Sequence, residues 1–282
     1  MVLGVSTINP AEFYQSIKLL SGHDRETAIL DALDTEDYQN IPEWMQPKEL
    51  TFHGKDAQGQ DHTVTLQVSP DYLGFGSGTD YFRVPMWPST AQKLAQDHGF
   101  YLPTKKIVDL IYQGAGIKLP PKPIRQSYFL ANHFSMTSPR AFWEHNQMVE
   151  AQLQALGNDR TKIIAGHKKD IVLTPKLKNH PGHVAIYGWH VRIKGKTDAT
   201  RLPEFWYSKP IQGLNYTDHS NTYVDYSHGV RLIGETVVID GVDYPIGDVL
   251  RHPILHVLLS DEGAFDFREV EMVYYNDSGI KL

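Results

Sequence analysis

The sequence predicts an α+β protein in which a helix-rich N-terminal half, residues 1–157, packs on a β-rich C-terminal half, residues 158–282. Two observations favour this class. Helix-capping residues are concentrated before Gly157, whereas short runs of β-branched and aromatic residues follow it. The sheet of the second half is expected to be antiparallel or barrel-like, and the two halves can form one continuous domain.

Helix-capping residues predict five helices in the first half. Asn or Ser before Pro is a typical start, because the side-chain oxygen accepts a backbone N–H and Pro needs no donor at the first helical position. The longest helix is expected to end near Gly157, since glycine is a common helix stop. The predicted N-cap residues are Asn9, Asp24, Ser89, Thr104 and Ser138.

Alternating apolar and polar residues predict the strands. In the first half, residues 49–54 and 62–69 flank a Gly-containing connection and predict a β-hairpin, with His53 and His62 exposed beside its loop. In the second half, the expected strands are residues 163–164, 171–173, 184–187, 223–232, 236–239 and 270–275, with a helix at 248–259.

Composition limits the class of protein. The net charge of −6 argues against nucleic acid as a partner, because a phosphate-binding protein usually concentrates Lys and Arg on one face. The absence of Cys excludes disulfides, a thiolate nucleophile and a zinc site built on sulfur. No apolar run approaches the ~20 residues that span a bilayer, so no membrane span is expected. The compartment stays open, and secretion with a signal peptide already removed is compatible with the sequence.

Two polar and aromatic motifs lie directly beside strand-like apolar runs, which is where a scaffold usually presents reactive side chains. They are Gly188-Trp189-His190 and residues 225–231, Asp-Tyr-Ser-His-Gly-Val-Arg. Six of the fourteen histidines, at positions 167, 180, 183, 190, 219 and 228, lie within residues 167–228, so groups that titrate near neutral pH are concentrated around the motifs. Acid–base chemistry is therefore the expected use of the motifs.

Strand geometry selects among the pairings. Adjacent strand residues point to opposite faces, so a Ser227–His228 dyad is not expected unless a turn intervenes. His190 and His228 are instead expected to meet in one pocket beside Trp189 and Tyr226, with their rings within about 10 Å. One imidazole would accept a proton, while the other, or Tyr226, would donate one.

Charged residues complete the predicted site. Lys168 or Arg231 would stabilise developing negative charge, and Asp225 or Asp170 would fix the tautomer of a histidine. The predicted catalytic residues are His190, His228, Tyr226, Ser227, Lys168, Asp170, Asp225 and Arg231, and the predicted substrate-binding residues are Trp189, Tyr187, Gln212, His219 and Tyr223.

Residues 227–232, Ser-His-Gly-Val-Arg-Leu, resemble the Ser-His-Gly-Cys-x-Arg signature of L,D-transpeptidases, which are β-rich enzymes that act on bacterial cell-wall peptides. The nucleophilic Cys of that signature is absent, which excludes a thiol transpeptidase. A wider set of motifs resembles an uncharacterised family of bacterial proteins, from which no function follows. These motifs are His167-Lys168-Lys169-Asp170, Tyr187-Gly188-Trp189-His190, Pro210-Ile211-Gln212 and Asp225-Tyr226-Ser227-His228-Gly229.

We expect a hydrolase that acts on a polymer, such as a cell-wall glycan, peptide or polysaccharide, by histidine-based acid–base catalysis. Three alternatives stay open: a polysaccharide lyase in which Arg231 neutralises a uronate carboxylate, a metal-dependent hydrolase, and a non-catalytic carbohydrate-binding or interaction protein. No cofactor is expected for the hydrolase, whereas zinc is the metal of the second alternative. The partner is a polymeric or small-molecule substrate, and the oligomeric state is not indicated. The zinc ligands would be His183, His190, His219 and His228.

Overall fold

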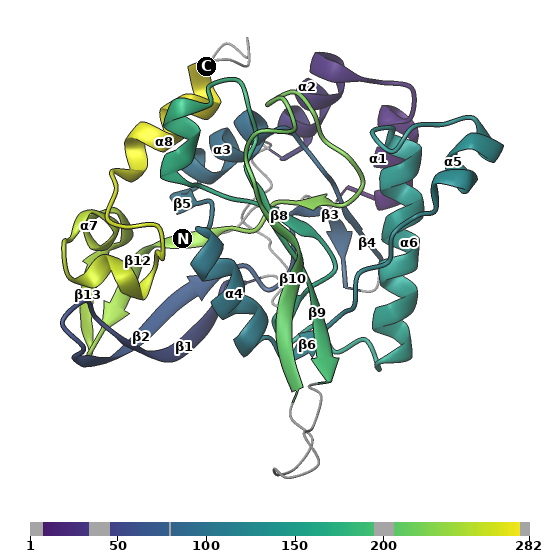
Figure 1. Cartoon of the computed structure of the whole chain (residues 1–282). Coiled ribbons are helices and arrows are strands. Elements are labelled where there is room, and N and C mark those ends of the chain that lie inside the picture. Colours follow the sequence, from purple (N-terminus) through teal and green to yellow (C-terminus); the bar gives the residue numbers. More distant parts are fainter. Residues whose placement is uncertain (1–7, 34–45, 79, 195–205, 277–282) are drawn as a thin grey trace.

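A computed structural model of the chain describes residues 8–33, 46–78, 80–194 and 206–276 (Figure 1). It shows a mixed α+β fold with open, largely antiparallel sheets, which confirms the predicted fold class. None of the helices in these ranges is long and apolar enough to cross a bilayer.

The helices begin largely where their caps predict. The Asn9 carboxamide accepts the backbone N–H groups of Ala11 and Glu12, and the hydroxyls of Thr104 and Ser138 cap two later helices in the same way. Asp24 and Ser89, which were also expected to cap helices, instead lie inside helices that begin earlier, at Gly22 and Pro88. The α-helices are α1 (Pro10–Ile17), α2 (Gly22–Leu33), α3 (Pro88–Asp97), α4 (Lys105–Gly114), α5 (Gln126–Asn132), α6 (Pro139–Ala155), α7 (Ile246–Arg251) and α8 (Phe267–Asn276), and the 3-10 helices are η3 (Pro175–Asn179) and η4 (Leu255–Leu258).

One sheet combines strands from both halves of the chain. The predicted hairpin is confirmed, because its two strands pair antiparallel from Lys48 opposite Val68 to Lys55 opposite Asp61. The second strand of the hairpin then pairs with a strand from the C-terminal half. The expected division into a helix-rich half and a β-rich half is therefore not confirmed. The order is β1 (Lys48–Lys55), β2 (Asp61–Val68), β12 (Ile233–Ile239) and β13 (Val242–Pro245), with β5 (Phe100–Tyr101) also paired to β12.

A second sheet carries the motifs singled out in the sequence. Its strands follow the order β10 (Trp206–Asn215), β9 (Ile186–Lys194), β8 (Lys169–Ile171) and β11 (His228–Gly229), and only the β8–β11 pair is parallel. α4 packs against β9 (Figure 1). Two short strand pairs complete the described structure: β3 (Gly74–Ser77) with β4 (Asp80–Arg83), and β6 (Ile117–Lys118) with β7 (Ile164–Ala165).

A buried ionic network ties β4 to α6. The Arg83 guanidinium is almost fully buried and donates to both oxygens of Asp71, at 2.9 and 2.5 Å, and to Glu150 at 2.6 Å. The carboxamide of Asn146 accepts another of its donors. Because every charge in this network has an opposite partner, the core can hold it without an uncompensated ion.

Further expectations about the chain were wrong. The single helix expected at residues 248–259 is divided into α7 and the 3-10 helix η4. Residues 270–275 lie in α8 rather than in a strand, because Phe267, Val270 and Tyr274 are buried at helical spacing. His62 is buried rather than exposed, and its ring lies between the carboxylates of Asp56 and Asp240. The strand expected at 223–232 is reduced to β11, for a reason that also shapes the candidate site.

Candidate functional site

The short strand β8 separates two polar clusters. Adjacent strand residues point to opposite faces, so Lys169 and Asp170 define two sides that we call the Lys169 face and the Asp170 face. His228 is paired in register with Lys169, which places it on the Lys169 face. Tyr187 is paired with Asp170, which places it on the Asp170 face.

A turn at residues 225–228 replaces the expected strand. The backbone N–H of His228 donates to the Asp225 carbonyl at 3.1 Å, and the Asp225 carboxylate accepts both the backbone N–H of Ser227 (2.7 Å) and its hydroxyl (2.5 Å). An Asp side chain that binds the backbone two residues later favours a turn over a strand. The turn brings Asp225 and His228 to the same side, whereas strict strand alternation would separate them.

The floor of the Lys169 face consists of Asp225, Ser227 and His228, which are all buried. Nε2 of His228 lies 3.9 Å from Oδ2 of Asp225, and this oxygen also accepts the Tyr223 hydroxyl at 3.2 Å. Neither ring nitrogen of His228 has a hydrogen-bond partner among the described residues. Buried polar groups are usually satisfied, so the two unused nitrogens of this imidazole mark it as a candidate for function.

The rim of the Lys169 face consists of four half-buried side chains. The Lys169 ammonium lies 5.0 Å from the centre of the Trp189 ring, within the range of a cation–π contact. The rings of His219 and Tyr223 are stacked at 4.3 Å and lie 6.2 and 5.9 Å from the His228 ring. Aromatic rings next to a charged group can hold a sugar or a peptide plane beside the floor.

The charges on this face follow from burial and from neighbouring groups. Burial alone would raise the pKa of Asp225, but His228, Lys169 and the hydrogen bonds from Ser227 outweigh it, so the pKa is lowered and the group is a carboxylate. Burial lowers the pKa of His228 to about 4, which makes its imidazole neutral at pH 7. Burial also lowers the pKa of Lys169, against the pull of Asp225.

His190 lies on the Asp170 face. Gly188 and Trp189 both have positive φ angles, of 116° and 55°, which interrupt the alternation of β9. As a result, Tyr187 and His190, three residues apart, both donate to the Asp109 carboxylate of α4, at 2.8 and 2.7 Å. The His190 ring also stacks on Tyr112.

The expected convergence of His190 and His228 is therefore not found. The two imidazoles lie on opposite faces of the sheet and share no contact, because the break in β9 turns His190 toward α4. Asp109, and neither Asp170 nor Asp225, holds the His190 ring. Asp109 was missed by sequence reasoning, since an acidic residue within a helix gives no signal of its partner.

Asp170 and Arg231 form a buried ion pair on the Asp170 face of the sheet. Arg231 donates to the carbonyls of Ser69 and Ile164 at 2.7 Å, and its Nε lies 3.8 Å from Oδ1 of Asp170. The Tyr72 hydroxyl donates to the other oxygen of Asp170 at 2.9 Å, and burial raises the pKa of this carboxyl to about 6. The Arg231 guanidinium is already engaged by these two carbonyls and by Asp170, so the role expected for it in a lyase, neutralising a substrate carboxylate, does not fit.

Lys168 and Tyr226 also point into the protein. The Lys168 ammonium donates to the Tyr226 carbonyl at 2.5 Å, and burial lowers its pKa to about 7. The Tyr226 hydroxyl accepts the backbone N–H of Ile124 at 3.0 Å, and its ring lies against Phe129 and His145. Both side chains pack beneath the turn at residues 225–228, on the side of the protein interior, and are not part of the Lys169 face.

The remaining candidates are scattered. Gln212 lies on β10 and its amide donates to the carbonyl of Gly213. Nδ1 of His183 lies 3.1 Å from the Pro181 carbonyl, and its ring is 6.0 Å from His180. The four histidines proposed as zinc ligands do not converge, because His190 lies on the other face of the sheet. Within the described ranges, no group of three or more His, Asp or Glu side chains is arranged to hold a metal ion.

Comparisons with known proteins do not assign the chain to a family or a fold. No family model matches the chain. Searches of curated proteins and of solved structures found no match either.

Proposed function

We propose that the protein is a hydrolase of a polar polymer, such as a cell-wall glycan or peptide, and that the Lys169 face is its active site. The observation that carries the proposal is the neutral His228 imidazole, which lies 3.9 Å from the ionised Asp225 and has no partner for either nitrogen among the described residues. A base next to a fixed carboxylate is the arrangement that general acid–base catalysis requires.

The proposed reaction assigns one role to each group. His228 accepts a proton from a water molecule as the water oxygen attacks the scissile carbon, and Asp225 stabilises the imidazolium that forms. The Lys169 ammonium stabilises the oxygen that gains negative charge. The imidazolium then returns the proton to the leaving group. The products are the two halves of the substrate with the elements of water divided between them.

Ser227 has a positioning role. The Ser227 hydroxyl and backbone N–H both donate to the same oxygen of Asp225. The hydroxyl proton of Ser227 is therefore not directed at His228. The rings of Trp189, His219 and Tyr223 supply the surface on which a sugar or peptide unit would rest. Aromatic and charged groups together on one face favour a polar substrate over an apolar one.

The test is a screen of the purified protein on polysaccharides, peptidoglycan and esters, with product analysis. We expect release of reducing ends or free carboxyl groups without unsaturated sugar, and at least about tenfold lower turnover in Lys169→Ala. Lys209→Ala, an exposed lysine on β10, is the matched control and should behave as the wild type. Formation of unsaturated sugar would identify a lyase instead. Binding of glycans without turnover would identify a non-catalytic binding protein.

A further inference from the structure

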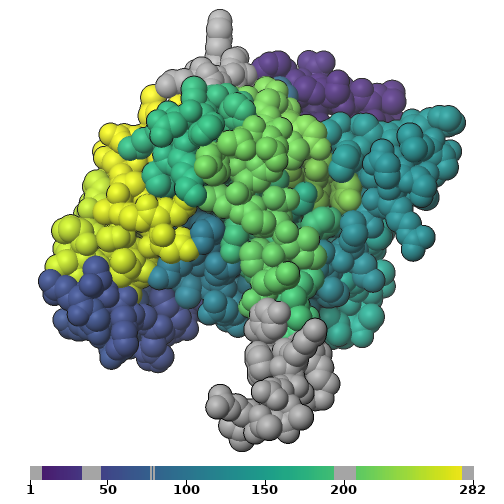
Figure 2. Space-filling view, in the orientation of Figure 1, coloured from purple at the N-terminus to yellow at the C-terminus, as the bar shows by residue number. Residues whose placement is uncertain are grey.

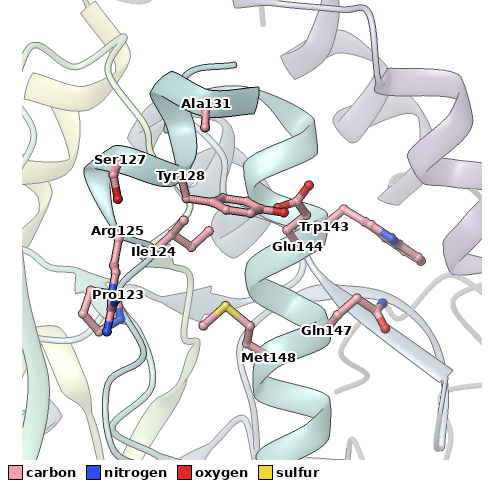
Figure 3. Close-up of a pocket in the computed structure, with 10 residues that line it drawn as sticks. All are labelled: Pro123, Ile124, Arg125, Ser127, Tyr128, Ala131, Trp143, Glu144, Gln147 and Met148. Atoms are coloured by element: carbon pink, nitrogen blue, oxygen red, sulfur yellow. The ribbon is translucent and has the colours of Figure 1, made fainter. Parts of the chain in front are cut away.

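A concave site lies between α5 and α6, outside the Lys169 face. Its volume is about 1000 Å³, at the upper end of the range of about 300–1,000 Å³ for small-molecule sites. α5 projects from the surface beside α6, as the ribbon and space-filling views show (Figures 1 and 2). The Tyr128 side chain extends from α5 across the cavity, and Met148 of α6 lies on its other side (Figure 3).

The walls of this α5–α6 pocket are held in place by buried anchors. Phe129 of α5 is buried against Phe134 and Tyr226, at 5.1 and 5.7 Å between ring centres. Its neighbour Tyr128 is directed outward and is 43% exposed. On α6, the Trp143 ring is stacked on Tyr14 at 4.9 Å, which fixes the indole. The two helices that line the pocket are therefore each fixed to the protein by buried or stacked aromatic rings.

The chemistry of the lining selects the ligand. Most of the lining is apolar, with Ile124, Tyr128 and Met148 among its members, whereas Ser127 and Gln147 are its neutral polar side chains. A sugar needs a denser set of hydrogen-bonding groups than these two residues supply. The body of the ligand should therefore be an apolar chain or ring.

The charged side chains at the pocket indicate the charge of the ligand's head group. The Glu144 carboxylate at the pocket is already paired with Arg140 at 2.8 Å. Arg125 is exposed at the pocket and makes no ion pair within the described part of the chain, which leaves one unpaired guanidinium. A guanidinium binds carboxylate and phosphate oxygens through paired hydrogen bonds.

We infer that the α5–α6 pocket binds a small amphiphile with an apolar body and a single anionic head, with Arg125 on the head and Tyr128 and Met148 on the body. This site is independent of the proposed hydrolase activity, because it shares no residue with the Lys169 face. The pocket is linked to the turn below the Lys169 face through Tyr226, whose hydroxyl accepts the Ile124 backbone N–H and whose ring lies against Phe129.

The test is isothermal titration of the full chain with dodecanoate below its micellar concentration, with dodecanol as the uncharged probe. We expect a micromolar Kd for dodecanoate and weaker binding of dodecanol. Arg125→Ala should weaken dodecanoate binding by about tenfold or more and leave dodecanol binding unchanged. Ala131→Trp, at an exposed position that lines the pocket, should abolish binding of both probes.

Arg268→Ala, an exposed arginine on α8, is the matched control and should bind dodecanoate as the wild type does. Circular dichroism of each variant checks that the fold is retained. The inference is overturned if dodecanoate fails to bind, if Arg125→Ala binds it as tightly as the wild type, or if Ala131→Trp retains binding. Association with phospholipid vesicles in the absence of dodecanoate binding would also overturn it.

Discussion

Nε2 of His228 lies 3.9 Å from Oδ2 of Asp225, and the turn between these two residues is closed by the same carboxylate, whose other oxygen accepts from Ser227. One aspartate therefore shapes the backbone and sets the electrostatic environment of the imidazole. The pairing depends on the turn, because an uninterrupted strand would alternate the side chains along residues 225–228.

Loss of the Asp225 charge should impair turnover more than folding. Asp225→Asn keeps an oxygen for the Ser227 donors but removes the negative charge beside His228, so we expect turnover to fall by about 10²-fold or more. Initial rates on the substrate found in the screen measure the effect. Asp243→Asn, an exposed aspartate of β13, is the control. Equal rates in Asp225→Asn and the wild type would remove Asp225 from the mechanism.

Trp189 should contribute to substrate binding rather than to the chemical step. Its ring lies beside Lys169 on the rim, at a positive φ of 55° that a bulky residue rarely adopts. We expect Trp189→Gly, which tolerates this backbone conformation, to raise KM by about tenfold while kcat changes by less than about threefold. Steady-state kinetics separate the two parameters. A fall in kcat at unchanged KM would assign Trp189 to the reaction itself.

Protonation of His228 should destabilise the fold at acidic pH. Its pKa is lowered by burial from 6.5 to about 4, and Asp225, Lys169, Lys168 and His219 are the charged or titratable groups that act on it. Between these values the unfolded chain binds a proton more readily than the folded one, so stability falls as the pH decreases from 6.5 to 4. One such group accounts for up to about 3 kcal/mol of this loss.

Urea unfolding of the wild type and of His228→Asn across this pH range measures that contribution. The other titrating groups are common to both proteins, so the variant should show a shallower decline in the free energy of unfolding. Parallel pH profiles would show that the pKa of His228 is not lowered in the folded state.

The buried Arg83 network should matter far more for stability than an exposed ion pair of similar geometry. Arg83→Met leaves the carboxylates of Asp71 and Glu150 without their shared guanidinium, and we expect a loss of about 3–5 kcal/mol in the free energy of unfolding. Lys55→Ala, which removes an exposed pair with Asp61, should leave stability nearly unchanged. Chemical denaturation of both variants tests this contrast, and similar losses would contradict it.

Local signals in the sequence predicted local structure well. The caps at Asn9, Thr104 and Ser138 and the hairpin of β1 and β2 were all found, because each depends on a few neighbouring residues. The helix α8 was missed because its β-branched and aromatic residues resemble a strand when read without their packing.

The candidate site required information that is not local. The motifs do converge on one small sheet, but the turn closed by Asp225 and the break at Trp189 decide which side chains meet. The sequence motifs do not reveal those two backbone features, and without them His190 and His228 are the expected pair. Asp109 is distant in sequence from His190, so its hydrogen bond to that ring followed only from the packing of α4 on β9.

The most direct test of the account compares His228→Ala with His190→Ala, because the two histidines lie on opposite faces of the same sheet. Turnover per folded protein is measured on the substrate found in the screen, at a temperature at which both variants are folded. If the Lys169 face is the active site, His228→Ala should lower kcat by about 10²–10⁴-fold and His190→Ala by less than about threefold. Equal losses in the two variants, or a larger loss in His190→Ala, would contradict the account.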